Sequence, residues 1–297
     1  MKHDLNLRKR LILRSRLLTA SRRPLPDILI LGAQKSGTTS LFNYLIKHPR
    51  IRRGRTKEVH YFDLNHDKEV NWYRAQYPLF LSKKRMQSFS FVDASPLYFF
   101  HGDCPERAHR VVPDARLIIL LRCPIERAYS HYQHAFKRGY ESRPCIQAIE
   151  EELSGIDPER PIAPLPRETF FHFRQRSYIR RGIYAPQISR WLAYFSREAL
   201  LILDANQFFL DTRRVMSRVF SHLGHEDHPS IDENTVYKRG QYDSLVPDDV
   251  RKTLEAFYLE HNNALENLTG STFSWVSREQ GQQRCASDSW SACSVGN

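Results

Sequence analysis

The sequence predicts an α/β protein in which a central parallel sheet is flanked by helices on both faces. Short apolar segments of strand length alternate with segments in which apolar residues recur every three or four positions, as in amphipathic helices. Within the apolar segments there is no apolar–polar alternation, which is typical of strands buried on both faces of a parallel sheet. We therefore expect three layers of helix, sheet and helix, with ligands bound beyond the carboxyl ends of the strands.

Composition allows one large domain or two small ones in 297 residues, with an ordinary hydrophobic content of 41%. The formal net charge is +12. Such a surplus suits polyanionic partners, namely a nucleotide, an acidic glycan, nucleic acid or a membrane surface, and the charge alone does not choose among them.

The N-terminus, residues 1–26, is predicted to be a basic lead-in closed by Pro24 and Pro26. It lacks the apolar core of a secretory signal, and no stretch approaches the roughly 20 apolar residues that span a bilayer. A solvated helix is expected here, and peripheral contact with anionic lipid is the alternative. The five scattered cysteines favour reduced thiols and a cytoplasmic location. Neither cysteines nor histidines have metal-ligand spacing, so no metal site is predicted.

The most informative stretch joins the predicted strand Ile28–Leu31 to a loop and a helix. The loop fits G-x-x-x-x-G from Gly32 to Gly37, and its backbone N–H groups would surround an anion at the helix N-terminus. A Walker A motif would have lysine at position 38, where this chain has threonine, and the lysine of this loop is Lys35. The cradle residues predicted to bind phosphate are Gln34, Lys35, Ser36, Gly37, Thr38, Thr39 and Ser40.

A second segment, Thr56–Asp63, mixes charged and apolar residues and reads as neither a regular strand nor an amphipathic helix. Glu58 lies there between Lys57 and His60, with aromatic residues following. A carboxylate kept ionised by neighbouring cations and shielded by aromatic walls is a candidate general base. A surface loop with an incidental salt bridge is the alternative for this segment taken alone.

Two further buried strands are predicted at Ser90–Asp93 and Arg116–Arg122. The first ends in Asp93, as a Walker B strand would, so the residues leave a magnesium-dependent kinase open at this point. The second ends in Arg122, and a helix follows that carries Ser130. A forked guanidinium and a hydroxyl in this arrangement suit a phosphate monoester.

Taken together, these motifs resemble the sulfotransferases that use 3′-phosphoadenosine 5′-phosphosulfate (PAPS). The loop G-A-Q-K-S-G-T-T-S-L and the segment K-E-V-H-Y-F-D are most similar to the heparan sulfate glucosaminyl 3-O-sulfotransferases and bacterial carbohydrate sulfotransferases. The resemblance extends over residues 27–276 and implies a P-loop-type three-layer fold, with PAPS as the donor and adenosine 3′,5′-bisphosphate as the product.

Site roles follow from the same resemblance. Glu58 is expected to be the catalytic base, and Lys35 to stabilise the charge on the leaving phosphate oxygen. The expected acceptor-site residues are Lys57, His60 and Asp63. Arg122 and Ser130 are expected at the 3′-phosphate, with the loop Lys238-Arg239-Gly240 closing over the nucleotide. Arg127 is expected to be structural or to face the acceptor.

The remaining chain is interpreted as follows. Residues 50–55 should form a basic loop, and residues 139–170 an insertion with a short helix and a proline-rich loop at the rim. Another buried strand is predicted at Leu200–Leu203. Helices are expected around 106–112, after 124, around 184–195, at 214–223 and at 247–268. A single domain should cover 27–276, followed by a disordered tail at 277–297.

The sequence therefore predicts an enzyme that moves the sulfuryl group of PAPS to a hydroxyl of a carbohydrate, either a glycan or a glycolipid. The basic surface favours an acceptor that is already acidic, although a small metabolite would also serve. A P-loop kinase that uses ATP and magnesium, and a non-enzymatic binder of polyanions or nucleic acid, are the alternatives. Thr38 and Arg122 disfavour the first, and the second does not explain Glu58 or the cradle, so no nucleic-acid partner is expected.

Overall fold

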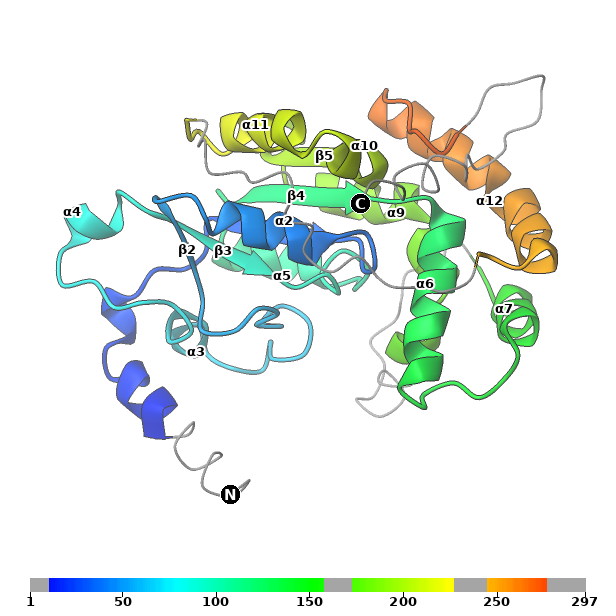
Figure 1. Cartoon of the computed structure of the whole chain (residues 1–297). Coiled ribbons are helices and arrows are strands. Elements are labelled where there is room, and N and C mark those ends of the chain that lie inside the picture. The colour runs from blue at the N-terminus through cyan, green and yellow to red at the C-terminus, as the bar shows by residue number, and fades with distance from the viewer. Residues whose placement is uncertain (1–10, 158–172, 227–244, 277–297) are drawn as a thin grey trace, which may run out of the picture.

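A five-stranded, wholly parallel sheet forms the centre of the molecule (Figure 1). The computed structural model describes residues 11–157, 173–226 and 245–276. The strand order is β2-β3-β1-β4-β5, so the strand that leads into the cradle is the central one. The strands are β1 (Ile28–Gly32), β2 (Ile51–Arg53), β3 (Ser90–Ala94), β4 (Arg116–Leu121) and β5 (Leu200–Asp204).

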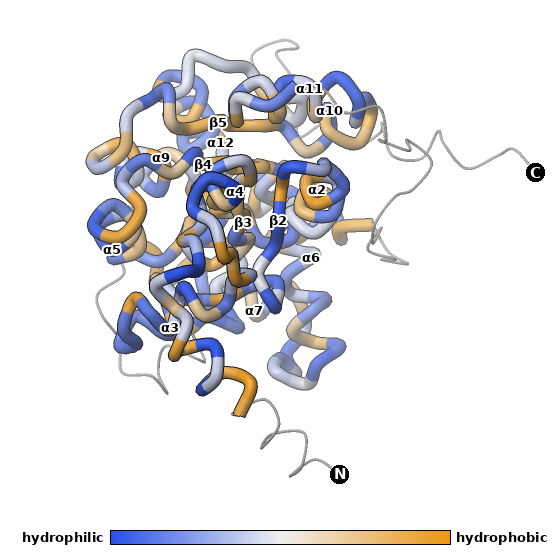
Figure 2. Tube along the Cα trace, turned by 90° about the vertical axis from the view of Figure 1, so that its left-hand side faces the viewer, coloured by the Kyte–Doolittle hydropathy of each residue, from blue (hydrophilic) through white to orange (hydrophobic). Residues whose placement is uncertain are grey.

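Successive residues of the central strand enter opposite cores, which explains why the strand is apolar throughout. Leu29 and Leu31 belong to one core, while Ile28 and Ile30 belong to the other. The smaller core is covered by α2 (Thr38–Leu45), α10 (Ala205–Leu210) and α11 (Thr212–His222). The larger one is covered by α5 (Cys104–Val111), α6 (Pro124–Lys137), α9 (Tyr184–Leu192) and α12 (Asp248–Thr269). The predicted three-layer α/β fold is therefore confirmed, and Figure 2 shows hydrophobic residues along β5.

The basic segment 50–55, expected to be a loop, contains the edge strand β2. Ile51 to Arg53 pair in parallel with Ser90 to Val92 of β3. The prediction was wrong because β2 has only one neighbour and three residues, and two of those are arginines. An open edge tolerates charged side chains, which hide the strand pattern in the sequence.

Outside the three layers lie the short helices α3 (Val70–Arg74), α4 (Lys83–Met86) and α7 (Cys145–Ser154). The last of these is the short helix expected in the insertion, whose proline-rich part at 158–172 lies outside the described residues. The six-residue helix α10 was not predicted, because it follows β5 without a loop. Asp204, the last residue of β5, caps it by accepting hydrogen bonds from the backbone N–H groups of Asn206 and Gln207.

The basic N-terminal segment packs against the fold through two of its arginines. Residues 11–17 are helical. The Arg16 side chain donates to the carbonyl oxygens of Ala75 and Tyr77, and Arg23 donates to that of Tyr77 at 2.7 Å. These carbonyls follow the end of α3, where cations favourably meet unpaired backbone oxygens. In the described ranges, no helix has the length and apolar character needed to cross a bilayer.

We expect Gly182→Ala to destabilise the fold through overpacking. A Cβ at Gly182 would lie 2.4 Å from the Tyr258 hydroxyl and 2.9 Å from Pro124 Cβ, so α12 and α6 would both have to move. Such overpacking costs about 1–3 kcal/mol of unfolding free energy, measurable by urea denaturation. Gly155→Ala is the matched control, because its nearest neighbour would be an Arg180 nitrogen at 3.8 Å. Equal stabilities for the two variants would contradict the close approach of α12 at Gly182.

Candidate active site

The glycine-bracketed loop at the end of β1 has the geometry of an anion cradle. Gly37 takes the left-handed conformation, with φ of 96°, and is the N-cap of α2. A Cβ at this position would also lie 2.6 Å from the Phe209 ring, so both the conformation and the space require glycine. The Ser36 hydroxyl is buried, and no described residue hydrogen-bonds to it. A buried polar atom without a partner beside a helix N-terminus fits the expected phosphate.

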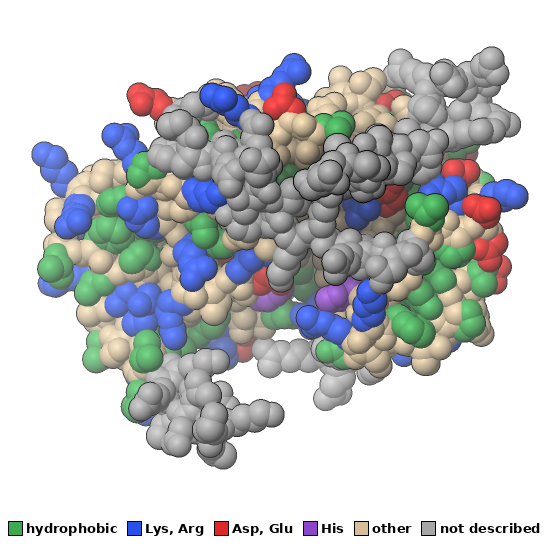
Figure 3. Space-filling model, in the orientation of Figure 1, with side chains coloured by type: hydrophobic (Ala, Val, Ile, Leu, Met, Phe, Trp, Pro, Cys, Tyr) green, Lys and Arg blue, Asp and Glu red, His purple; other side chains and the backbone are tan. Residues whose placement is uncertain are grey.

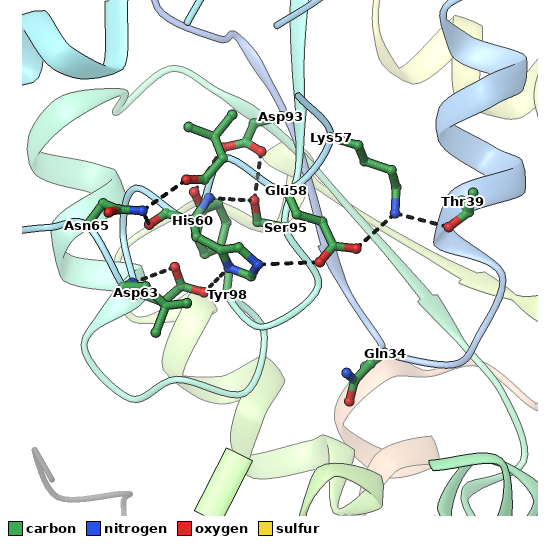
Figure 4. A network of polar contacts seen from close by, with 12 residues as sticks. Gln34, Thr39, Lys57, Glu58, His60, Asp63, Asn65, Asp93, Ser95 and Tyr98 are labelled. Atoms are coloured by element: carbon green, nitrogen blue, oxygen red, sulfur yellow. Dashed lines mark hydrogen bonds and ion pairs between the residues drawn. The ribbon is translucent and has the colours of Figure 1, made fainter. Parts of the chain in front are cut away.

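Lys57 links the cradle to the predicted base (Figure 4). Its Nζ donates to Thr39 Oγ1 of α2 at 3.0 Å and lies 3.1 Å from Glu58 Oε1. Thr39 and Glu58 come from segments on either side of β2, so only the folded chain brings them together. The positive charge of Lys57 therefore lies between the anion cradle and the candidate base.

His60 and Asp63 extend this chain of contacts beyond Glu58. Glu58 Oε2 lies 3.4 Å from His60 Nε2, and His60 Nδ1 lies 2.7 Å from Asp63 Oδ2. The Asp63 side chain is buried and accepts a second hydrogen bond from the backbone N–H of Leu64. Asp63 thus orients the imidazole, and the imidazole orients Glu58.

The charged side chains of Lys57, Glu58, His60 and Asp63 stabilise one another. Burial alone would raise the pKa of Glu58, but the hydrogen bond from His60 and the charge of Lys57 outweigh burial and lower it to about 2. Burial likewise opposes protonation of His60, but its hydrogen bonds to Asp63 and Glu58 raise its pKa to about 9. At neutral pH the carboxylate is ionised and the imidazole is protonated. The Glu58 side chain is 43% exposed, so it remains reachable by a substrate.

Asp93 anchors the loop that carries Glu58 and His60. It is 1% exposed, and it accepts hydrogen bonds from Ser95 at 2.8 Å, Tyr73 at 2.8 Å and Tyr98 at 2.9 Å. The Ser95 and Tyr98 oxygens in turn accept the backbone N–H groups of His60 and Tyr61.

The anchored loop contains two residues in the left-handed region, Glu58 with φ of 63° and His60 with φ of 54°. Non-glycine residues rarely adopt this conformation, and they keep it where the surroundings impose it. The hydrogen bonds that Asp93 organises impose it here.

The remaining predicted residues are placed as follows. Arg122 follows β4, beside the central strand, and forms an ion pair with Glu126 at 2.7 Å. Ser130 is buried in α6, the helix that Arg122 precedes. Arg127 is structural, because it is fully buried and donates to the Tyr178 carbonyl oxygen. The predicted loop Lys238-Arg239-Gly240 lies outside the described residues.

The sequence reasoning missed two basic residues near the cradle. His134 lies on α6 one turn beyond Ser130, a spacing that places both on one face and that would have signalled it. Burial and then the nearby charge of Lys35 lower the pKa of His134 to about 4, so it is neutral at pH 7. Arg181 donates from Nη1 to Gln34 Oε1 at 2.8 Å, and no local pattern signals this contact.

Figure 3 shows histidine side chains lining a hollow on this face of the molecule, with an acidic side chain at its edge. In the described parts of the chain, no group of three His, Cys, Asp or Glu side chains could hold a metal ion.

Comparison with known proteins shows the family to which the chain belongs. Residues 25–292 match the sulfotransferase domain family. The chain is 30% identical over 271 residues to mouse bifunctional heparan sulfate N-deacetylase/N-sulfotransferase 4, covering 82% of this chain and 30% of that protein. It is also 26% identical over 278 residues to mouse heparan sulfate glucosamine 3-O-sulfotransferase 6, covering 86% and 75%. The chain thus spans about 30% of the length of the bifunctional relatives.

A sulfotransferase from Alicyclobacillus acidocaldarius has the same fold. Its crystal structure superposes with a TM-score of 0.62 at 26% identity, covering 84% of this chain and 97% of that one. The match to the sulfotransferase domain covers most of the chain, including every described site residue. The protein belongs to the sulfotransferase family.

Proposed function

We propose that this sulfotransferase moves the sulfuryl group of PAPS to a hydroxyl of a carbohydrate and releases adenosine 3′,5′-bisphosphate. One observation carries the proposal. A continuous chain of contacts runs from Thr39 in the cradle through Lys57, Glu58 and His60 to Asp63. It joins a place for the phosphosulfate to a carboxylate that can receive a proton.

The residues present fit this donor. The unpartnered Ser36 hydroxyl, the N-terminus of α2 and the glycine-only position at Gly37 suit the 5′-phosphosulfate. Arg122 and Ser130 would hold the 3′-phosphate, with Lys238, Arg239 and Gly240 proposed to close over the nucleotide. The donor supplies the sulfuryl group, whose bond to the 5′-phosphate oxygen breaks as a bond to the acceptor oxygen forms.

In the proposed reaction Glu58 removes the proton from the acceptor hydroxyl as that oxygen attacks sulfur. Lys35, in the cradle, neutralises the negative charge that grows on the departing phosphate oxygen. The remaining catalysis is a matter of holding donor and acceptor in line and of placing positive charge where negative charge develops.

Through Lys57, binding of the donor would change the pKa of the proposed base, Glu58. The ammonium group of Lys57 donates to Thr39 and pairs with Glu58, and its charge helps to keep the pKa of Glu58 low. Negative charge in the cradle would attract Lys57 away from Glu58 and oppose the ionised carboxylate directly. Both effects raise the pKa of Glu58 and make it a better proton acceptor when the donor is bound.

A carbohydrate acceptor is supported by the position of His60 and Asp63 beside Glu58, since imidazole and carboxylate groups suit sugar hydroxyls. The relatives named above act on heparan sulfate, and Lys and Arg side chains gather on the face that Figure 3 shows. We therefore propose an acidic glycan of the glycosaminoglycan kind. The buried free thiol of Cys104 supports the further proposal of a reducing, cytoplasmic setting.

The kinase alternative loses its proposed magnesium ligand. Asp93 is buried and its two oxygens accept three hydrogen bonds from side-chain hydroxyls. It therefore acts as a structural anchor, whereas a magnesium ligand would need an accessible oxygen.

The donor is tested by a binding titration. We expect adenosine 3′,5′-bisphosphate to bind by calorimetry in the presence of a chelator, because the cradle supplies backbone amides and lysine in place of a cation. ATP serves as the control nucleotide. Magnesium-dependent binding of ATP, with none of the bisphosphate, would refute the donor proposal in favour of the kinase.

The base is tested with Glu58→Gln, which keeps the size of the side chain. We expect kcat to fall by about 10²–10⁴-fold, as for other general bases, with bisphosphate affinity within about threefold of wild type. Transfer is measured with sulfate-labelled PAPS and a panel of oligosaccharides. Glu69→Gln, an exposed carboxylate at the start of α3, is the control. Equal loss of transfer and of bisphosphate affinity would make Glu58 a structural residue.

His60 makes the stability of the site dependent on pH. Its folded pKa of about 9 lies above the ordinary value of 6.5, so folding favours the protonated form. This stabilisation is complete below about pH 6.5 and disappears as pH rises through 9. We expect wild type to exceed His60→Gln in unfolding free energy by about 1–2 kcal/mol at pH 6, since partial exposure of Glu58 screens the pair. Urea denaturation should show that difference shrinking by pH 9.5, and a constant difference would mean that His60 is neutral.

A further inference from the structure

Arg181 connects a distant part of the chain to the phosphate cradle. It belongs to the 3₁₀ turn η2 (Arg180–Gly182), and its Nη1 donates to Gln34 Oε1 at 2.8 Å across 147 residues of sequence. The same guanidinium donates from Nη2 to the Arg174 carbonyl oxygen at 2.9 Å and lies 4.6 Å from the centre of the Phe100 ring. Arg181 is 3% exposed, so packing and hydrogen bonds determine its position.

This contact determines which way the Gln34 amide faces. A guanidinium can only donate hydrogen bonds, so the atom that meets Arg181 must be the amide oxygen, and the NH₂ group must point elsewhere. Figure 4 shows the Gln34 side chain reaching into the space below Lys57 and Glu58, with its nitrogen on the Glu58 side and its oxygen turned away. Among the residues that the structure describes, none accepts a hydrogen bond from this nitrogen.

The turn that carries Arg181 is itself held firmly. Glu152 of α7 accepts the backbone N–H groups of Ile179 and Arg180 at 2.8 and 3.1 Å. From the other side, the Tyr258 hydroxyl of α12 donates to the Ile179 carbonyl oxygen at 2.7 Å. Arg181 therefore extends from a turn clamped between α7 and α12, which gives its guanidinium a defined place relative to the cradle.

The surroundings of Arg181 have an excess of positive charge. Arg127 and Arg181 are both buried, and no described carboxylate lies within ion-pair distance of either. Both ring nitrogens of the buried His131, on α6, also lack hydrogen-bond partners in the described chain. Burial, followed by the charges of Arg127 and Arg174, lowers the pKa of Arg181 to about 9, so it still carries its charge at neutral pH. The more distant charges of Glu152 and Asp63 compensate it in part. Buried cations are costly, and the negative charge that develops on the sulfuryl oxygens during transfer would offset the rest of that cost.

We propose that Arg181 is a positioning residue for sulfuryl transfer: by fixing the Gln34 amide oxygen, it aims the amide nitrogen at the sulfuryl group as that group passes to the acceptor. The proposal rests on the proposed function and adds a specific role for Gln34. The hydrogen bond would strengthen as charge develops on the sulfuryl oxygens, and it would be absent with adenosine 3′,5′-bisphosphate, which has no sulfuryl group.

The test compares Gln34→Ala, Arg181→Gln and the double variant. We expect each single change to lower kcat by about 10–100-fold, and the double variant to lower it no further, because Arg181 acts through Gln34. The affinity for adenosine 3′,5′-bisphosphate should stay within about twofold of wild type in all three. Gln34→Glu keeps an oxygen for Arg181 but loses the donor, so we expect it to fold as wild type and to lose kcat as Gln34→Ala does.

Arg180→Gln is the matched control, because it removes the same charge from the same turn while its side chain reaches the Gly155 carbonyl oxygen instead of the cradle. We expect its kcat to stay within about twofold of wild type. Wild-type kcat in Gln34→Glu, multiplicative losses in the double variant, or a parallel loss of bisphosphate affinity would each overturn the positioning role. If wild type transfers no sulfate from PAPS to any oligosaccharide tested, the proposed function fails, and this role fails with it. An active wild type with an active Arg181→Gln would refute the positioning role alone.

Discussion

The buried carboxylate of Asp93 is the constraint on which the geometry of the site depends. Three hydroxyl groups, from Tyr73, Ser95 and Tyr98, satisfy it in the interior, where an unpaired carboxylate would be costly. Two of those hydroxyl oxygens then receive the backbone of the loop that carries Glu58 and His60. Hydrogen bonds therefore connect the central sheet to Glu58 and His60, two residues in an unfavourable backbone conformation. Such a network holds a reactive side chain in place without a regular element beneath it.

With the loop fixed in this way, charge is distributed along a line. Positive and negative groups alternate from Lys57 through Glu58 and His60 to Asp63, and each keeps its neighbour ionised. The same order explains how one carboxylate can be both reachable and strongly acidic. Because Lys57 also contacts Thr39 of the cradle, the electrostatic state of the base depends on what the cradle holds. In the proposed reaction, Lys57 would therefore couple donor binding to proton transfer.

Positive charge is arranged differently on the two sides of the cradle. Around Glu58, the cations Lys57 and His60 are paired with carboxylates and partly exposed. Arg127 and Arg181 are instead buried, and no described carboxylate forms an ion pair with them. A buried cation that only donates to carbonyl oxygens contributes a field that solvent does not screen. Keeping these arginines buried costs stability, and the negative charge that develops in the proposed sulfuryl transfer would offset part of that cost.

The sequence by itself determined the α/β class, the cradle and the candidate base, because these depend on local features. Unbroken apolar strands, a glycine pair with Lys35 between them, and the octapeptide around Glu58 can each be read over a few residues. Only the tertiary structure decided that segment 50–55 contributes an edge strand, that Asp93 is an anchor instead of a metal ligand, and that His134 and Arg181 lie near the cradle. The reason is physical: a charged edge strand has no distinctive pattern, and side chains 147 residues apart meet only through packing, which determines where each donor finds its acceptor.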